Sequence, residues 1–294
     1  PATACVLRRQ RDVFGDARFE RLGSISVAHL YNLRNSDAYR QQRVVLTKTS
    51  GERAATIGVR RAPVPEGRPG FIRIDSVHQG DLDGVKGLYH IDAVDCVTQW
   101  QVVASVQTIS EAHMLPVIAQ MLQQFPFKIL GFHADNGSEY VNHRVAMLLN
   151  KLRIEFTRSR PRNSNDNALV ETKNGAVVRK VFGYTHIPQR HAARFNTFCV
   201  EYLNPFLNFH RPCLFATEVP DPKKPGRIKR VYRPADAMTP LDKLASLPAA
   251  TTHLRSGITL EHLQQLARAL SDVQAAEELA EARAALFRRV PARA

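Results

Sequence analysis

The chain has 294 residues, of which 44% are hydrophobic and 23% charged, and its formal net charge is +14. These proportions are those of globular proteins and exclude a wholly disordered chain. No apolar run approaches the roughly 20 residues that a membrane-spanning helix needs, so a membrane protein is excluded as well.

The excess positive charge lies in the two flanks of the chain. Residues 1–70 carry 13 Lys or Arg against 6 Asp or Glu, and residues 191–294 carry 15 against 10. Residues 71–190 are nearly balanced, with 13 against 11. Basic flanks around a balanced centre suit a polyanion held from both sides, and a surplus that only maintains solubility is the alternative.

Residues 1–45 predict a helical segment. Helices are expected at 3–14, 16–22 and 26–34, and Ser26 is the expected N-cap of the third. The segment opens on Pro and not on Met, which predicts a truncated reading frame.

The third of these helices has an apolar and a polar side. The apolar side consists of Val27, Leu30 and Tyr31, spaced three and four residues apart. The polar side offers His29, Asn32 and Arg34. This pattern fits a helix-turn-helix whose last helix enters the major groove of DNA, or an ordinary small helical subdomain.

Residues 46–70 are rich in Gly, Pro and basic residues and predict a linker. Residues 71–190 then predict a mixed sheet with helices packed against it, an α/β fold. The expected strands are 71–77, 88–94, 100–106, 128–134 and 154–157, and the expected helices are 110–125, 141–152 and 164–183.

Residues 191–294 predict a basic, partly helical C-terminal region. Helices are expected at 194–209 and 260–289, on either side of a basic segment at 220–234 that prolines interrupt. The cysteines are too scattered for a disulfide framework or a zinc site, and we expect reduced thiols at Cys5, Cys96, Cys199 and Cys213.

Three acidic residues occupy positions that suit a pair of magnesium ions. Asp75 and Asp135 come at or just after the ends of predicted strands, and Glu171 lies in the second turn of a predicted helix. Two Mg²⁺ ions about 4 Å apart activate the nucleophile and stabilise the leaving oxygen in phosphodiester transfer. Mg²⁺ prefers oxygen ligands, so carboxylates suit it better than His or Cys.

A single Asp after a strand is more often a turn residue or a cap than a ligand. The set is more specific because 35 residues separate Asp135 from Glu171 and an Asp-Asn-Gly turn follows the strand. Rival acids whose spacing is less distinctive are Glu139, Asp92 and Asp95. Asp166 is interpreted as a helix cap.

The residues around these acids resemble DDE transposases of bacterial insertion sequences, which have a retroviral-integrase-type catalytic core. The matching segments are Arg73-Ile74-Asp75-Ser76-Val77-His78, His133-Ala134-Asp135-Asn136-Gly137-Ser138-Glu139 and Asn165-Asp166-Asn167-Ala168-Leu169-Val170-Glu171. The likeness covers about 71–183 and extends more weakly to 25–34 and to 204–212.

This resemblance implies an RNase H-like core in which Asp75, Asp135 and Glu171 hold two Mg²⁺ or Mn²⁺ ions and catalyse DNA strand cleavage and transfer. It implies double-stranded DNA as partner, both element ends and target, and action as a homo-multimer on DNA. It also favours the helix-turn-helix interpretation of the N-terminal segment. A cytoplasmic, nucleoid-associated protein without a membrane anchor is expected.

Several basic residues near the acids are expected to contact DNA: Arg158, Arg160, Arg162, Lys173 and Arg179. Many members of the family carry Lys seven residues after the Glu, whereas position 178 is Val here, and Arg179 is the expected substitute. Possible accessory residues are His78, His133 and Asn136, although a purely structural hydrogen bond would equally explain either histidine.

Two other functions are compatible with the sequence. One is a truncated or domesticated transposase that binds DNA without cutting it. The other is a different RNase H-like nuclease, such as one that cuts RNA–DNA hybrids. The complete set of acids disfavours the first, and the basic flanks disfavour the second.

Overall fold

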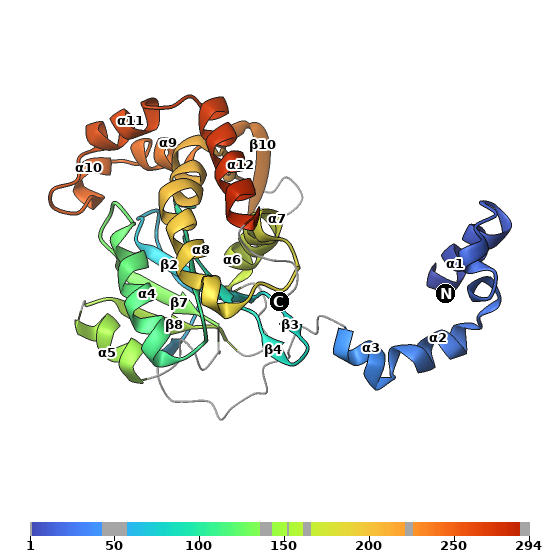
Figure 1. Ribbon diagram of the computed structural model, residues 1–294. Helices are drawn as coiled ribbons and strands as arrows, with labels where there is room; N and C mark the ends of the chain where they lie inside the picture. Colours follow the sequence, from blue (N-terminus) through green and yellow to red (C-terminus); the bar gives the residue numbers. More distant parts are fainter. Residues whose placement is uncertain are drawn as a thin grey trace. The chain divides into compact units, whose positions relative to one another are not determined.

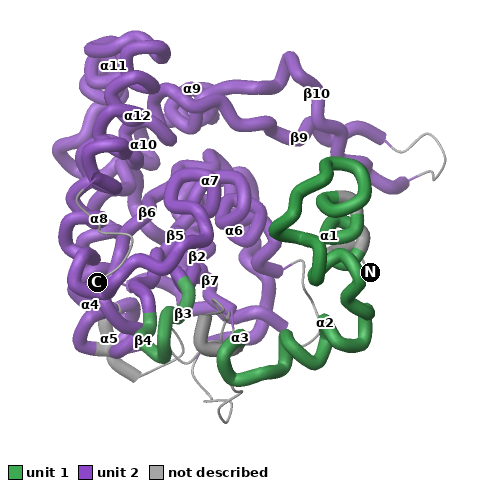
Figure 2. The backbone as a smooth tube through the Cα atoms, turned by 45° about the vertical axis from the view of Figure 1, so that its right-hand side comes forward, with its two compact units in different colours: residues 1–47, 80–86 green, residues 48–79, 87–294 purple. Residues whose placement is uncertain are grey.

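The computed structural model describes residues 2–42, 58–135, 143–151, 153–160, 166–220 and 226–288. The chain forms two compact units, which Figure 2 distinguishes by colour. The N-terminal unit comprises residues 1–47 and 80–86, and the main unit comprises residues 48–79 and 87–294.

The N-terminal unit is mostly helical. It contains α1 (Ala2–Asp12), 3-10 turns at Ala17–Phe19 and Leu22–Ser24, α2 (Val27–Arg34), α3 (Asp37–Gln42) and a hairpin of β3 (Asp81–Leu82) and β4 (Val85–Lys86). Ser26 caps α2 as predicted, since its hydroxyl accepts a hydrogen bond from the His29 amide at 3.1 Å. The predicted helix at 16–22 is replaced by the two 3-10 turns.

The main unit is built on a six-stranded mixed sheet in the order β1-β8-β7-β2-β5-β6. Its strands are β1 (Val59–Arg60), β2 (Phe71–His78), β5 (Tyr89–Asp95), β6 (Gln101–Val106), β7 (Gly131–Ala134) and β8 (Glu155–Arg158). β5 pairs antiparallel with both β2 and β6, whereas β7 is parallel to β2 and to β8. This arrangement confirms the predicted α/β class and RNase H-like core.

The predicted linker, residues 46–70, contains one short strand. Val59 and Arg60 form the edge strand β1, which pairs in parallel with β8 through Thr157 and Arg158. A two-residue strand carries no periodicity that a sequence could reveal, because its pairing depends entirely on a neighbour far along the chain.

One face of the sheet is apolar and packs against two helices. Ile72, Ile74 and Phe132 project from this face and are almost completely buried. They meet Met114 and Ile118 of α4 (Glu111–Gln123), while α5 (His143–Lys151) adds to the same cluster. Figure 1 shows α4 and α5 on this side of the sheet. We call this side the apolar face.

The opposite face carries Asp75, and we call it the acid face. A continuous helix covers it, made of α6 (Ala168–Lys173), a π-helical turn at Asn174–Val178 and α7 (Arg179–Phe182). The helix ends at Gly183, as predicted, where φ is +75° and a residue without Cβ is favoured. Val177 and Phe182 form an apolar cluster with Val77 of β2.

A second long helical segment follows and also belongs to the acid-face cluster. It comprises α8 (Ala192–Phe198) and π-helical turns at Cys199–Leu203 and Phe206–His210. Phe195, Leu203 and Leu207 are buried in the cluster. The segment corresponds to the helix predicted at 194–209.

This helical segment also seals the open edge of the sheet at β6. Asn208 accepts a hydrogen bond from the Gln101 amide at 2.8 Å and donates one to the Gln101 carbonyl at 2.7 Å. Asn204 does the same for Val103, at 2.9 and 3.0 Å. The two amide side chains therefore satisfy edge groups that would otherwise attract another strand. They also give a structural reason for the motif at 204–212.

The C-terminal region contains a ribbon that the sequence did not predict. β9 (Cys213–Pro220) and β10 (Ile228–Met238) pair antiparallel, so the basic segment at 220–234 spans the outer end of a β-ribbon. Four helices follow: α9 (Pro240–Ala245), α10 (Ala250–His253), α11 (Leu260–Arg268) and α12 (Asp272–Arg288). The stretch 260–289, predicted to be largely helical, contains α11 and α12.

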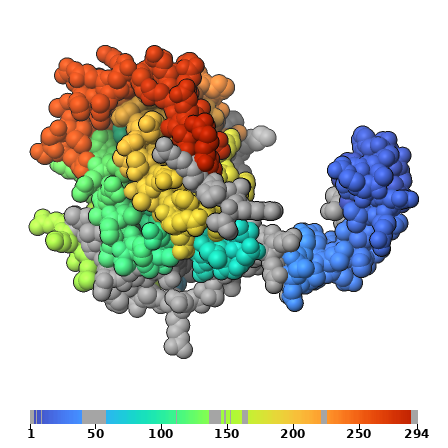
Figure 3. Space-filling view, viewed as in Figure 1, coloured from blue at the N-terminus to red at the C-terminus, as the bar shows by residue number. Residues whose placement is uncertain are grey.

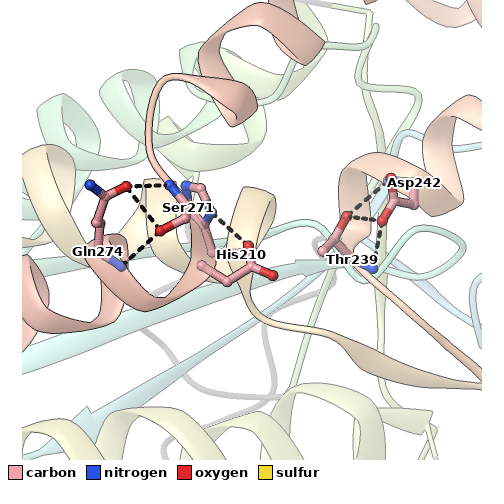
Figure 4. Close-up of polar contacts among 6 residues, drawn as sticks. His210, Thr239, Asp242, Ser271 and Gln274 are labelled. Atoms are coloured by element: carbon pink, nitrogen blue, oxygen red, sulfur yellow. Dashed lines mark hydrogen bonds and ion pairs between the residues drawn. The ribbon is translucent and has the colours of Figure 1, made fainter.

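The C-terminal helices are fixed to the main unit by apolar burial and by polar contacts. Leu241, Leu244 and Leu263 join the cluster of the apolar face. His210 Nδ1 lies 3.0 Å from Asp272 Oδ1, and Thr239 and Asp242 form a capping box at the start of α9 (Figure 4). In the space-filling view these helices, orange and red, form one continuous surface with α8, yellow (Figure 3).

Cys96, Cys199 and Cys213 are free thiols, in agreement with the predicted reduced state. Within the described ranges, no helix combines the length and the apolar character needed to cross a membrane.

Candidate active site

Asp75 projects from β2 onto the acid face. The strand alternates, so Ile74 enters the apolar core while Asp75 and Val77 point the other way. The Asp75 carboxylate accepts hydrogen bonds from the Ser76 amide at 2.8 Å and from Asn174 Nδ2 at 2.7 Å. These two donors fix the orientation of a half-buried carboxylate.

The helix that carries Glu171 is attached to β2 on both sides of Glu171. Asn167 Nδ2 donates to the Ile74 carbonyl at 3.2 Å, and Asn174 donates to Asp75. Glu171 lies four residues after the first Asn and three before the second, and its side chain is exposed. The two amides therefore hold Glu171 near the middle of β2.

The other two acids act electrostatically on Asp75. Burial, the negative charge of Asp135 and, more weakly, that of Glu171 together raise the pKa of Asp75 to about 7. The hydrogen bonds from Ser76 and Asn174 oppose this shift. Asp135 directly follows β7, which pairs in parallel beside β2. The fold thus brings the predicted acids to one region of the sheet.

The chemical type of these side chains suits a divalent cation, whereas the spacing between them in this structure suits it less well. Carboxylate oxygens are the ligands that Mg²⁺ prefers. The buried Oδ1 atoms of Asn167 and Asn174 have no hydrogen-bond partner among the described residues, so unsatisfied oxygens lie beside the acids. Within those residues, however, no three His, Cys, Asp or Glu side chains are clustered closely enough to hold a metal ion. Metal binding would have to draw the carboxylates together.

Of the rival acids, Asp92 and Asp95 have internal partners. Asp92 faces Asp75 across the β2–β5 pair and is fully buried, and Gln101 Nε2 donates to both its oxygens at 2.8 and 3.0 Å. Asp95 accepts hydrogen bonds from the Gly70 and Thr98 amides, both at 2.7 Å. The carboxylates of both residues are therefore engaged in hydrogen bonds within the fold. Glu139 lies outside the described residues.

The side chains of Lys173 and Arg158, both predicted to contact DNA, are buried in this structure. Lys173 is 7% exposed and donates a hydrogen bond to Cys213 Sγ at 3.0 Å. Arg158 is 5% exposed on β8. A helical position two residues from Glu171 points away from it.

Arg160 and Asp166 form an ion pair, which overturns the interpretation of Asp166 as a helix cap. Asp166 accepts hydrogen bonds from the Arg160 amide at 2.9 Å and from its guanidinium at 2.8 and 3.0 Å. This pairing holds the pKa of Asp166 at about 2. The N-cap of α6 is Asn167 instead. Arg162 and Asn136, also predicted site residues, lie outside the described residues.

Arg179 is half-buried and its guanidinium is used within the protein. It donates to the His78 carbonyl at 2.9 Å and lies over the Tyr184 ring, with 5.0 Å between the guanidinium carbon and the ring centroid. Val178 stands at the position where Lys was expected from the family resemblance. The position is completely buried, so a side chain there cannot present a cation to DNA. His78 stacks on Tyr89 at 4.4 Å between ring centroids. In this structure Arg179 joins α7 to the end of β2.

His133 has a structural environment. Its Nδ1 lies 2.9 Å from Thr157 Oγ1 and its Nε2 lies 3.3 Å from Ser159 Oγ. Burial lowers the pKa of His133 to about 4, and the positive charge of Arg73 adds to this shift. The ring is therefore neutral near pH 7 and connects β7 to β8.

The polar residues predicted on the third helix are exposed in the N-terminal unit: His29, Asn32 and Arg34. The predicted apolar side of α2 is exposed as well, with 38% exposure for Val27 and 52% for Tyr31. The assignment of this helix to the major groove stays a prediction.

Asn174 is the site residue that sequence reasoning missed. It lies one helical turn after Glu171, and a residue at i+3 shares the helix face of residue i. That spacing was the only available signal, and it became meaningful once β2 was known to pass beneath the helix.

The comparisons with known proteins match the part of this chain that forms the central sheet. Residues 68–164 match the family model described as "Integrase core domain", a stretch that includes Asp75 and Asp135 and ends before Glu171. "Uncharacterized protein y4rM" of Sinorhizobium fredii (strain NBRC 101917 / NGR234) is 34% identical over 117 residues, which is 40% of this chain and 33% of that protein. The match therefore spans about a third of that relative's length.

Among solved structures, the catalytic core domain of BIV integrase shares 20% identity, with 39% of this chain and 70% of that chain covered and a TM-score of 0.32. The HTLV-2 integrase catalytic core domain in complex with magnesium shares 16%, with 46% and 87% covered and a TM-score of 0.35. A simian T-cell lymphotropic virus intasome in complex with PP2A regulatory subunit B56 gamma shares 17%, with 60% of each chain covered and a TM-score of 0.31. The family match supports a relationship with integrase-type and transposase-type catalytic cores.

Proposed function

We propose that this protein is a transposase that cuts DNA at the ends of an insertion sequence and transfers the ends to target DNA. One observation carries the proposal: Asp75 is subject to the charges of both Asp135 and Glu171 on one face of an RNase H-like sheet. The match of residues 68–164 to the integrase core domain supports the same chemistry.

In this proposal Asp75, Asp135 and Glu171 would hold two Mg²⁺ or Mn²⁺ ions. When bound, the ions activate the attacking oxygen and neutralise charge on the leaving oxygen. Asn174 holds Asp75 in place through its hydrogen bond of 2.7 Å. The repulsion among the three carboxylates favours binding of cations, because a divalent ion compensates the buried negative charge.

The reaction has two steps of the same kind. In the first, a water oxygen attacks the phosphorus at an element end, and the bond to the 3′ oxygen breaks to give a 3′-hydroxyl and a 5′-phosphate. In the second, that 3′-hydroxyl attacks a phosphodiester of target DNA and releases a new 3′-hydroxyl from the target strand. The number of phosphodiester bonds is unchanged in the second step, so no nucleotide triphosphate is required.

The proposed partners are double-stranded DNA, as element end and as target, and further copies of this chain assembled on DNA. The basic flanks support a polyanionic partner, since 1–70 and 191–294 hold most of the excess positive charge. The exposed polar side of α2, with His29, Asn32 and Arg34, is the proposed groove-contacting element of the N-terminal unit.

The test is strand transfer by the full chain on duplex oligonucleotides that copy the inverted repeats flanking its gene. Wild type is expected to join them to target DNA when Mg²⁺ is present, and Asp135→Asn is expected to lose joining while keeping DNA binding. Asp83→Asn is a matched control. Asp83 is exposed and has φ of +51°, a conformation that Asn tolerates well. Joining by Asp135→Asn at the wild-type rate would refute the site.

The alternatives are separated by the substrate that wild type processes. Cleavage of RNA–DNA hybrids without joining of duplex DNA would indicate a different RNase H-like nuclease. Binding of duplex DNA without cleavage in either Mg²⁺ or Mn²⁺ would indicate a non-catalytic DNA-binding protein.

A further inference from the structure

The β9–β10 ribbon is firmly attached at its base. Cys213 at the start of β9 accepts the hydrogen bond from Lys173, and Gln99 Nε2 donates to the Leu214 carbonyl at 2.9 Å. Phe215 is 8% exposed, and Lys243 lies over its ring at 5.3 Å from the centroid. The base of the ribbon is therefore part of the packed main unit.

The outer part of the ribbon has no comparable covering. From Ala216 to Pro220 on β9 and from Ile228 to Ala235 on β10, every side chain is exposed or only partly buried. Ile228 and Tyr232 are 64% and 61% exposed. They lie on one face of the ribbon together with Arg230, because residues two apart on a strand share a face. Figure 2 shows the ribbon running out from α9.

The outer ribbon also carries positive charge without matching acids. Its cations are Arg227, Lys229, Arg230 and Arg233. Of the two acids in the described part of the ribbon, Glu218 pairs with Arg230 at 3.3 Å and Asp236 accepts a hydrogen bond from Thr217 at 2.8 Å. Among the described residues, Arg227, Lys229 and Arg233 have no ion-pair partner.

We propose that the outer β9–β10 ribbon enters the major groove of double-stranded DNA, with the face of Tyr232 turned to the base edges, while Lys229 and Arg233, on the opposite face, extend to the phosphates that flank the groove. The B-DNA major groove is about 12 Å wide and admits a two-stranded β-ribbon. An exposed Tyr between cations suits this environment, because the phosphates attract the cations while the base edges accept apolar contact. The proposal rests on the proposed function, and it extends that function by naming a second DNA-binding element.

The attachment of the ribbon gives this element a fixed relation to the acids. Lys173, which binds the first residue of β9, lies two residues after Glu171 on the same helix. DNA bound by the ribbon is thus held by an element that is hydrogen-bonded to the helix that carries Glu171. This connection favours the view that the DNA bound by the ribbon is the same DNA that undergoes the reaction.

The test measures binding of the full chain to a fluorescent 30-base-pair duplex in EDTA, at several NaCl concentrations. The double variant Lys229→Gln, Arg233→Gln is expected to bind roughly tenfold more weakly. It should also reduce the slope of log K against log salt by about 2, since each phosphate contact contributes about 0.9 to that slope. Both side chains are exposed, and circular dichroism with a thermal melt checks that the variant folds.

The matched control is Lys128→Gln, Arg268→Gln, which removes the same charges from exposed positions outside the ribbon. Lys128 precedes β7, at the end of that strand opposite Asp135. The control is expected to keep the wild-type slope. Equal slopes for the ribbon variant and the control would overturn the proposal.

A second pair of variants tests the apolar contact. Tyr232→Ala is expected to weaken binding with no change in salt slope, whereas Tyr232→Phe keeps most of the affinity because the ring is retained. Equal affinity of Tyr232→Ala and wild type would remove Tyr232 from the interface. Stronger effects of the ribbon variants on single-stranded DNA or RNA than on duplex would contradict groove binding.

Failure of this proposal is distinguishable from failure of the proposed function. If wild type joins DNA strands and the ribbon variant binds like the control, the ribbon proposal alone is wrong. If wild type neither binds duplex DNA nor joins it, both proposals are wrong.

Discussion

The two faces of the central sheet are held by different forces. On the apolar face Ile72, Ile74 and Phe132 pack against α4, and each of these side chains is at most 1% exposed. On the acid face, between the acids and the β6 edge, the buried side chains include several polar ones that bond to one another or to backbone: His90, Asp92, Gln101, Ser105, Asn204 and Asn208.

This difference assigns separate roles to the faces. Burial of apolar surface is non-directional and supplies most of the folding free energy. Hydrogen bonds contribute little net stability but fix orientation, and each becomes costly when one partner is removed. Substitutions on the apolar face should therefore lower the free energy of unfolding. Substitutions on the acid face should instead disturb the orientation of side chains, the activity or the dependence of stability on pH.

Ile74→Ala should produce the largest loss of stability. Ile74 is 1% exposed, and truncating a buried Ile typically costs about 2–5 kcal/mol through lost burial and the resulting cavity. Urea denaturation measures the free energy of unfolding. Ile228→Ala is the control, because Ile228 is 64% exposed on the ribbon and its truncation should cost under about 0.5 kcal/mol. Similar losses for both variants would contradict the assignment of stability to the apolar face.

Asn208→Ala should cost less, about 1–3 kcal/mol, because it leaves the buried amide and carbonyl of Gln101 without their partner. The open β6 edge should also promote association, which light scattering detects. Asn196→Ala provides a graded comparison, since the Asn196 bond to the Ser105 amide is long, at 3.4 Å, and its loss should matter less. A greater loss in Asn196→Ala would show that the edge is not sealed by Asn208.

Asn174→Ala should leave stability nearly unchanged and reduce strand transfer about 10- to 100-fold, the usual cost of removing a residue that orients a metal ligand. Without the hydrogen bond of 2.7 Å, Asp75 is free to rotate. The Mg²⁺ concentration for half-maximal activity should rise, which a merely structural role would not cause. Thr172→Ala on the same helix is the control, because Thr172 is exposed and donates only to the Ala168 carbonyl. An unchanged Mg²⁺ requirement in Asn174→Ala would contradict the positioning role.

The sequence predicted the elements whose signals are local. The strand that carries Asp75, the Ser26 cap and the stop at Gly183 all follow from alternation, capping and turn chemistry within a few residues, although the strand continues past Asp75 to His78. The three acids were predicted from residue type and spacing, and in the fold Asp75 is subject to the charges of the other two.

What the sequence did not predict depends on partners far along the chain. Lys173 was predicted to contact DNA, but its side chain is buried and donates a hydrogen bond to Cys213, 40 residues away. Asn174 acquires meaning only from Asp75, 99 residues earlier. The ribbon was missed because prolines and glycine at its outer end resemble a loop, while strand pairing joins residues on either side of them.

His90 provides the smallest effect, a dependence of stability on pH. It stacks on Phe182 at 4.0 Å between ring centroids, and its Nδ1 lies 3.0 Å from Ser105 Oγ. Burial, with a smaller contribution from the charge of Arg179, lowers its pKa from 6.5 to about 3. Between these pH values the unfolded chain binds a proton at His90 and the folded chain does not. The contribution of His90 to stability should therefore fall as pH falls, by up to about 1.4 kcal/mol per pH unit, whereas the raised pKa values of Asp75 and Asp92 give contributions of the opposite sign.

Urea denaturation of wild type and variants at pH 7, 6 and 5 measures how His90, on the acid face, affects the pH dependence of the free energy of unfolding. His90→Gln should lower stability at pH 7, and the slope of its pH profile toward pH 5 should differ from that of wild type by up to one proton equivalent, since the titrating ring is gone. His262→Gln, at an exposed position on α11, should retain the wild-type profile. Ile74→Ala should lower all three values equally, because apolar burial binds no protons. Parallel pH profiles for His90→Gln and wild type would show that acid sensitivity arises elsewhere than at this buried ring.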